Sequence, residues 1–306
     1  MADKIYVVVG GTGNIGKEIA LGLLKKGKKV RVLARTPAKL KDLADKGAET
    51  VQADLQDAVA VKKAFAGASA AFVMIPPNYG APEFRKYQNQ VGQIQSDAIA
   101  GAGITHVVDL SSVGGHLPER TGVITGLYDQ EQRLNKLKDV NVVHLRPAFF
   151  MENHLFGIGT IKQMGLYGTP LKGDMPIPQI STRDIAAVAV DLLDKLDFSG
   201  KGARELFGPR DVSLEETTRV LGAAIGKKDL KYAQFPYADA EKAMVQMGMS
   251  ADVARIFVEM YKGFNEGLIR GTQPRSPQTN TPTTIEQFAQ TFAAAFNQQA
   301  EPARSR

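Results

Sequence analysis

Apolar runs alternate with amphipathic stretches along the first half of the chain. Runs rich in β-branched residues, such as KIYVVVG and KVRVLAR, predict buried strands, and IGKEIALGLLKKG has the apolar spacing of a helix. Further strands are expected in AETVQAD, SAAFVMI, THVVDLSS and NVVHLRPA, and a long helix from about residue 82 to 102. Strands and helices that alternate at this spacing join by right-handed crossovers, so the pattern predicts a parallel sheet covered by helices on both faces.

The alternation changes after Phe150. GTPLKGDMPIPQIS is loop-rich, STRDIAAVAVDLLDKL predicts a helix capped by Ser181 or Thr182, and ARELFGP predicts one more strand. Four further helices are expected, near Ser213–Ile225, Ala238–Met247 and Ala251–Gly267 and in TTIEQFAQTFAAAF. This half therefore predicts a smaller and mainly helical lobe.

The two halves divide the chain into two interleaved units. Residues 1–155 are expected to form a doubly wound α/β domain, to which a segment near 181–208 returns. Residues 156–300 are expected to form the smaller lobe. Residues 301–306 are short and polar, which predicts a frayed tail.

Composition narrows the class of protein. With 306 residues, 43% hydrophobic and 23% charged, the chain resembles an ordinary globular protein. It has no apolar run near the ~18 residues of a membrane span, and Met1 to Lys4 leave no room for a signal peptide. We therefore expect a cytoplasmic protein without membrane contact. The absence of cysteine excludes disulfides and thiol chemistry, and the four histidines lack metal-ligand spacing, so no metal is expected.

The formal net charge of +6 raises the question of nucleic acid. Much of the excess positive charge lies in residues 25–46, beside a glycine-rich turn. A nucleic-acid footprint requires a broader basic face, whereas one basic segment can serve a phosphorylated small ligand. We expect a small-molecule ligand and no nucleic acid.

A glycine motif joins the first strand to the first helix. Residues Gly11, Thr12, Gly13, Asn14, Ile15 and Gly16 fit G-x-G-x-x-G, and Gly10 extends the motif. Such glycines turn the chain, admit a pyrophosphate and let the helix pack closely on the strand, while helix amide groups face the phosphates. The position between a strand and a helix favours dinucleotide binding over a glycine turn without a ligand.

The end of the second strand bears on which dinucleotide binds. NAD-selective sites place an acidic residue there for the ribose 2′-hydroxyl, but this chain has Arg35, with Lys39 one turn later and no carboxylate before Asp42. Because a guanidinium can hold a 2′-phosphate, the sequence favours NADPH over NADH. The alternative is that Arg35 only ends the strand. Asp54, after the third strand, is placed to reach the adenine or to cap the next helix.

These stretches carry a family likeness. VVGGTGNIG, the strand end LAR, ADLQD and VVHLRPAFFMEN resemble the NmrA-like group of atypical short-chain dehydrogenases. That resemblance implies an NAD(P)-binding Rossmann domain with a small C-terminal substrate lobe. The group includes quinone, azo-dye and isoflavone-type reductases, and regulators that bind NADP without turning it over. The implied cofactor contacts are the glycine motif, Arg35, Asp54, Leu55, Ile75, Pro76 and Pro147.

The catalytic residues are less well defined. Ordinary short-chain dehydrogenases use Tyr-x-x-x-Lys, in which lysine lowers the pKa of the tyrosine. Here Tyr128 opens the corresponding helix, but Gln132 occupies the lysine position. Relatives in the NmrA-like group often have a lysine or histidine ahead of a Glu-x-x-Leu motif, which matches Glu131 to Leu134, but this chain has GLYDQ there and no such base. Ser111 ends the fifth strand where it could polarise a carbonyl, although serine is also common at strand ends. Reduction of a quinone or azo bond can take its proton from water, so the incomplete pair still permits an enzyme.

Four further residues are candidates for the substrate side. Phe149 and Phe150 follow the last strand of the first half and would form either an apolar wall for a flat substrate or core packing between the lobes. Tyr79 lies in PPNYG, which is expected to form a mobile loop over the nicotinamide edge. His116 lies in the loop after Ser112, where it could border the substrate.

These features predict an NAD(P)H-dependent reductase of a small flat or carbonyl-bearing molecule. The alternative is a non-catalytic NADP-sensing binding protein of the same fold. The length of the helix at residues 82–102 is the one indication of a homodimer.

Overall fold

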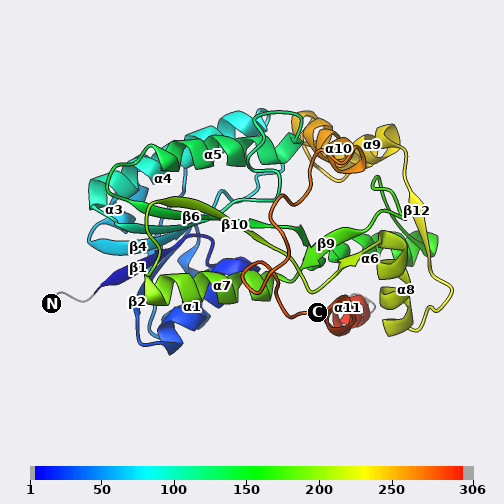
Figure 1. Ribbon diagram of the computed structural model, residues 1–306, viewed down its shortest axis with the longest axis horizontal. Coiled ribbons are helices and arrows are strands. Elements are labelled where there is room, and N and C mark those ends of the chain that lie inside the picture. Colours follow the sequence, from blue (N-terminus) through cyan, green and yellow to red (C-terminus); the bar gives the residue numbers. More distant parts are fainter. Residues whose placement is uncertain (1–3, 299–306) are drawn as a thin grey trace, which may run out of the picture.

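A seven-stranded parallel sheet forms the centre of the computed structural model, which describes residues 4–298 (Figure 1). The strand order is β10-β6-β5-β4-β1-β2-β3, and helices cover both faces. The predicted α/β fold with a doubly wound parallel sheet is thereby confirmed. The tail expected at residues 301–306 lies outside the described residues.

The strands of this sheet come from both halves of the chain. They are β1 (Ile5–Val8), β2 (Lys29–Ala34), β3 (Glu49–Gln52), β4 (Ala68–Val73), β5 (His106–Leu110), β6 (Asn141–Pro147) and β10 (Lys201–Leu206). The order reverses between β1 and β4, which places the ligand crevice of a doubly wound sheet at the carboxyl ends of these strands. The strand predicted in ARELFGP is β10, which adds to the β6 edge.

Two apolar layers hold helices against the sheet. The helices are α1 (Asn14–Lys25) and α7 (Thr182–Lys195) on one face, and α3 (Ala58–Phe65), α4 (Phe84–Ala102) and α5 (Thr125–Asn135) on the other (Figure 1). Successive residues of a strand point to opposite faces. In β1, Val8 therefore packs on the α1 side and Val7 on the α3 side, and both are fully buried. Short helices η1 (Pro37–Leu40) and α2 (Lys41–Ala44) follow β2.

The second lobe lies beyond the carboxyl ends of the strands (Figure 1). Its helices are η3 (Met151–Gly157), α6 (Ile158–Met164), α8 (Leu214–Ala224), α9 (Tyr237–Gln246), α10 (Ala251–Asn265) and α11 (Ile285–Gln298). Two small sheets, which the sequence did not predict, lie among them. One contains β7 (Phe149–Phe150), β9 (Ile177–Ile180) and β11 (Asp211–Val212), and the other pairs β8 (Leu166–Thr169) with β12 (Lys231–Gln234).

One long connection ties the lobes together. Residues 267–284, hereafter the strap, leave α10 and pass beside β10 before α11 begins (Figure 1). Backbone hydrogen bonds join Phe207, just after β10, to Thr279 and Thr281 of the strap. The carboxylate of Asp184 in α7 accepts hydrogen bonds from the backbone and hydroxyl of Thr283. The strap is therefore fastened to the first domain along its length.

Candidate active site

The turn between β1 and α1 presents free amide groups to the ligand crevice. Gly10 has a positive φ of 78°, and the Gly13 amide donates to its carbonyl at 2.9 Å, which closes the turn. Gly13 is the N-cap of α1 and has no side chain to cap it. The first amide groups of a helix have no intrahelical partner and lie at the positive end of the helix dipole. This end of α1 can therefore hold an anionic group.

The glycines of this turn are required for different physical reasons. A Cβ at Gly11 would lie 2.0 Å from a methyl carbon of Val32, and one at Gly16 would lie 2.4 Å from the Gly10 carbonyl oxygen. Those two glycines are required by the packing of β1, β2 and α1. A Cβ at Gly13 would meet only the Gly10 carbonyl oxygen, at 3.4 Å, so packing does not require glycine there. The space beside Gly13 is open, as a pyrophosphate cradle needs to be.

Two unpaired cations follow β2. Arg35 and Lys39 are exposed, and their side chains make no hydrogen bond or ion pair with residues 4–298. Asp42, the first carboxylate after Arg35, pairs with Lys17 of α1 at 3.0 Å. The end of β2 therefore offers positive charge and no free carboxylate to a ligand.

The other residues expected at the cofactor line the same edge of the sheet. Burial raises the pKa of the Tyr87 phenol, Asp54 raises it further and Arg35 opposes this, so both charges lie near Tyr87. The Tyr87 hydroxyl donates to the Pro76 carbonyl at 2.9 Å. The sequence carried no signal for Tyr87. Asp54 accepts from the amide of Gln56 and does not cap α3, whose N-cap is Asp57.

The remaining predicted contacts are mostly buried. Ile75 is buried, Leu55 is half-buried and packs against the core, and the carbonyl of buried Pro147 accepts the Val113 amide at 3.0 Å. That bond joins the loop after β5 to the last residue of β6.

Ser111 belongs to a buried polar network. Its hydroxyl donates to Glu131 of α5 at 2.5 Å, and Arg146 of β6 donates to both oxygens of the same carboxylate at 2.9 and 2.5 Å. Burial alone would lower the pKa of Arg146, but the bonds to Glu131 raise it above its ordinary value. A Cβ at Gly115 would strike the Ser111 hydroxyl at 2.4 Å. The network fixes the start of the loop after β5. An arginine inside the apolar stretch NVVHLRPA would signal a buried acidic partner, but the sequence does not show that this partner is Glu131.

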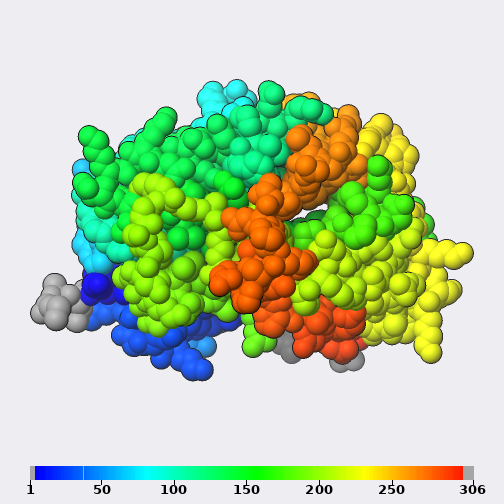
Figure 2. Space-filling model, viewed as in Figure 1, coloured from blue at the N-terminus to red at the C-terminus, as the bar shows by residue number. Residues whose placement is uncertain are grey.

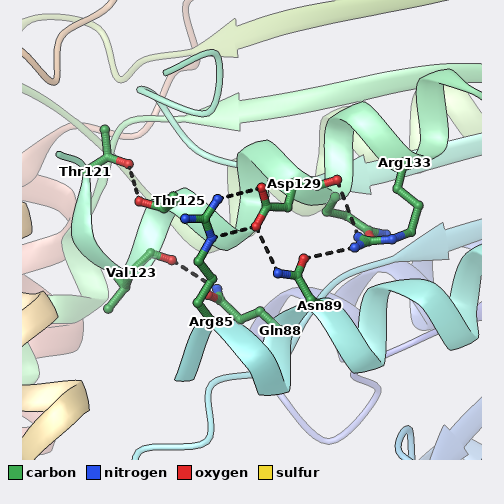
Figure 3. A network of polar contacts seen from close by, with 9 residues as sticks. Arg85, Gln88, Asn89, Thr121, Val123, Thr125, Asp129 and Arg133 are labelled. Carbon is green, nitrogen blue, oxygen red and sulfur yellow. Dashed lines mark hydrogen bonds and ion pairs between the residues drawn. The ribbon is translucent and has the colours of Figure 1, made fainter. Parts of the chain in front are cut away.

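Tyr128 lines a surface groove between α4 and α5. Figure 3 shows Arg85 and Asn89 of α4 facing Asp129 and Arg133 of α5, where these two helices run side by side. Tyr128 is half-buried and lines this groove of about 630 Å³ together with Gln132, the residue in the lysine position. Across this groove Arg85 donates two hydrogen bonds to Asp129 at 2.8 and 2.9 Å. Asn89 also donates to Asp129 at 3.0 Å, so the groove between the helices is polar.

The chain matches the model of the NmrA-like family over residues 1–289. The chain belongs to the NmrA-like family. This agrees with the resemblance seen in the glycine motif and the β6 segment, and with the strand order of the sheet.

Several proteins similar to this NmrA-like protein carry reductase names. It is 30% identical to the NAD(P)H azoreductase of Xenophilus azovorans, over 95% of this chain and 99% of that protein. It is 29% identical to the (4-alkanoyl-5-oxo-2,5-dihydrofuran-3-yl)methyl phosphate reductase of Streptomyces griseus, over 83% of this chain and 85% of that protein. A Citrobacter triphenylmethane reductase complexed with NADP(H) superposes with a TM-score of 0.79 at 18% identity, over 95% and 100% of the two chains, and shows the same fold.

The loop that carries Tyr79 is fixed to the second lobe of the NmrA-like protein. The Tyr79 carbonyl accepts the Ser250 amide at 2.9 Å, and its ring lies 6.0 Å from that of Phe257 in α10. The Ser250 hydroxyl donates to the Ala81 carbonyl at 2.6 Å. The loop therefore joins the two lobes beside the carboxyl edge of the sheet, and these contacts tie it to α10 where the sequence predicted a mobile loop.

His116, Phe149 and Phe150 lie on the interlobe side of β5 and β6. All three are half-buried, and the buried Nδ1 of His116 has no hydrogen-bond partner among residues 4–298. Phe150 packs against the main core, whereas Phe149 lines an interlobe pocket. Phe150 is therefore core packing. Phe149 packs against the small apolar cluster of Leu171, Ile177 and Leu214 and also faces the cavity, so its role as a substrate wall stays a prediction.

Phe149 also contacts a buried histidine, since its ring lies 5.3 Å from that of His154. His154 Nε2 is 2.8 Å from the Gln179 side-chain oxygen, and Nδ1 is 2.7 Å from the Tyr167 hydroxyl. The Gln179 amide nitrogen donates to Thr217, so its oxygen accepts from Nε2 of His154. Burial lowers the pKa of His154 to about 4. This network supports the lobe behind the pocket.

The described residues contain no cluster of three side chains suited to a metal ion. Within residues 4–298, the longest helices are too short or too polar to cross a membrane.

Proposed function

We propose that this NmrA-like protein is an NAD(P)H-dependent reductase of a small flat or carbonyl-bearing molecule, such as a quinone or an azo compound. The observation that carries the proposal is Gly13, a glycine that packing does not require, at the free amide end of α1. The azoreductase and dihydrofuranylmethyl phosphate reductase relatives, at 30% and 29% identity, support the reaction class.

We propose NADPH as the preferred cofactor. Arg35 and Lys39 are free to bind a 2′-phosphate, and the nearest carboxylate is tied to Lys17. The residues from Gly10 to Gly16 would hold the pyrophosphate, with Asp54 and Leu55 beside the adenine and Ile75, Pro76 and Pro147 beside the nicotinamide. When bound, the nicotinamide supplies the hydride.

The chain's own residues position the substrate and admit a proton. Reduction of a quinone to a hydroquinone needs one hydride and one proton. Ser111 gives its hydrogen to Glu131, so it can donate to a substrate only if that bond breaks. We therefore propose Ser111 as a residue that positions the β5 loop, with water as the proton source. Tyr128 lines the groove between α4 and α5 and is not among the residues of the interlobe pocket that Phe149 lines, and Gln132 occupies the lysine position, so we propose no proton transfer from it.

The experiment is to follow NADPH absorbance with purified protein and a panel of quinones, azo dyes and aldehydes. Oxidation of NADPH that depends on both protein and acceptor supports the proposal. Binding of NADPH with no turnover of any acceptor would refute the reductase and favour the cofactor-sensing alternative. Titration with NADH in parallel tests the cofactor preference.

The proposal of a homodimer rests on the length of α4, a 19-residue helix on the surface of the first domain. Sedimentation velocity tests it, since a monomer at micromolar concentration would refute it.

A further inference from the structure

An apolar pocket of about 270 Å³ lies between the two lobes, near the lower end of the ~300–1,000 Å³ usual for ligand sites. Its floor includes Val113, Ala148 and Phe149, which follow β5 and β6 at the carboxyl edge of the sheet. Ligands of open α/β sheets bind at that edge. The strap forms its outer wall, and Figure 2 shows the molecular surface hollowed beside this orange segment.

The strap is held firmly over this pocket. Glu205 of β10 is fully buried, and its carboxylate accepts from the amides of Thr272 and Gln273 at 2.7 and 2.8 Å and from the Thr272 hydroxyl at 2.9 Å. Gln273 in turn donates to the Ala203 carbonyl at 2.8 Å. Three charge-assisted bonds to one buried carboxylate fix the backbone of the strap. The pocket wall is therefore formed before any ligand arrives.

Two arginines of the strap line the pocket, and only one is engaged. Arg275 binds the carboxylate of Asp211, donates to the Gly208 carbonyl at 2.6 Å and lies over the Phe207 ring. Arg270 is exposed, and its guanidinium makes no hydrogen bond or ion pair with residues 4–298. Asp211, the one carboxylate that lines the pocket, is already neutralised by Arg275. The mouth thus carries one uncompensated positive charge beside an apolar interior.

We propose that this pocket binds the acceptor of the reductase and that Arg270 selects acceptors with an anionic substituent, such as a sulfonate or a carboxylate. The inference rests on the proposed function and adds the substrate class to it. The apolar walls accept the flat part of the molecule, and the planar guanidinium, with its several N–H donors, pairs with the anionic oxygens. Arg270 is a specificity-determining residue that binds a distant substituent, so it does not take part in the chemistry.

The test uses acceptors that share one azo skeleton and differ in a single ring substituent: neutral dimethylaminoazobenzene, its anionic para-sulfonate and its anionic para-carboxylate. The variants are Arg270→Gln, which removes the charge, and Arg270→Lys, which keeps it. Arg219→Gln is the matched control, because Arg219 is an exposed arginine of the same lobe that lies outside the pocket. Steady-state rates at saturating NADPH give kcat and KM for each pair of protein and acceptor.

Wild type and Arg219→Gln are expected to favour the two anionic dyes over the neutral one in kcat/KM. In Arg270→Gln the KM for the anionic dyes should rise about tenfold while kcat and the neutral dye change less than about twofold. Binding that is equal in ground and transition states appears in KM alone. Arg270→Lys should recover part of the loss, and added salt should raise the wild-type KM for the anionic dyes only.

Two results would overturn the inference while leaving the reductase intact. One is equal kcat/KM for neutral and anionic dyes in the wild type, and the other is an equal loss for all dyes in Arg270→Gln. If no dye is reduced, equilibrium dialysis of the sulfonated dye against wild type and Arg270→Gln decides the matter. Tighter binding to the wild type then supports the anion site although the reductase fails, and equal binding refutes the site as well.

Discussion

Replacing Gly13 by valine separates cofactor binding from folding. Gly13 has an extended backbone, with φ −96° and ψ 170°, which a β-branched residue readily adopts. The new Cβ would meet only the Gly10 carbonyl oxygen at 3.4 Å. We therefore expect the free energy of unfolding to change by less than about 1 kcal/mol, as for substitutions outside packed cores.

The loss in affinity follows from the bonds that the side chain would block. Each hydrogen bond to a charged group contributes about 1.5–3 kcal/mol. If valine at Gly13 excludes a phosphate from two amides of the α1 N-terminus, NADPH binding weakens by about 3 kcal/mol or more, which is at least ~100-fold in Kd. Gly13→Ala, with a smaller side chain, should give an intermediate loss.

The assay pairs calorimetric titration of NADPH with urea unfolding. The matched control is Gly16→Ala, whose Cβ would lie 2.4 Å from the Gly10 carbonyl oxygen and 2.9 Å from that of Val9. That overpacking should destabilise the fold by about 1–3 kcal/mol or more, and binding should fall with it. Unchanged NADPH affinity in a stable Gly13→Val protein would refute the assignment of this turn to the cofactor. A Gly13→Val protein as unstable as Gly16→Ala would refute the packing argument.

Three further substitutions test the site and its support. Arg35→Ala should weaken NADPH binding by about 1.5–3 kcal/mol and NADH binding much less. Lys46→Ala, at an exposed lysine of the same basic segment, is the control for general charge loss, and equal losses for both cofactors in Arg35→Ala would show that Arg35 does not read the 2′-phosphate. Tyr128→Phe should slow acceptor reduction by about tenfold or less, ~1.4 kcal/mol of barrier, and a thousandfold drop in kcat would instead identify a catalytic acid. Burial lowers the pKa of His154 from 6.5 to about 4, so below pH 6.5 the unfolded chain takes up a proton at this residue while the folded protein does not. The contribution of the neutral His154 to the free energy of unfolding is therefore complete above pH 6.5, and about 3 kcal/mol of it is lost as the pH falls to 4. His154→Gln should lack this part of the slope in urea unfolding measured from pH 7 to 4, and identical slopes would refute the neutral buried ring.

Local pattern was sufficient for the long elements and for some of their ends. The helix expected after GTPLKGDMPIPQIS begins at Thr182, and Ser181 caps it by accepting the Arg183 amide. The short strands of the second lobe were not predicted, because strands of two to four residues such as β11 and β8 carry too little periodicity to be recognised. Their pairing depends on partners far along the chain, as when β8 lies beside β12.

The candidate site residues also divide into features that local sequence predicted and features that only tertiary packing shows. The motif placed Gly11, Gly13 and Gly16 together, but only the packed structure distinguishes the glycines that Val32 and the Gly10 carbonyl enforce from the one that is open. Ser111 was recognised by its position at the end of a strand. Its engagement with Glu131, twenty residues later, is a tertiary contact that the sequence does not reveal.

The sequence by itself determined the family, the doubly wound sheet and the glycine-rich turn between the first strand and the first helix, because strand and helix periodicity and a glycine motif are local properties of the chain. Tertiary structure alone decided which charges are free. Arg275 and Arg270 lie five residues apart in one segment, yet the fold brings Asp211 to the first and leaves the second unpaired at the pocket mouth. Ion pairs and pocket walls form between residues distant in sequence, so their presence is set by how the lobes pack.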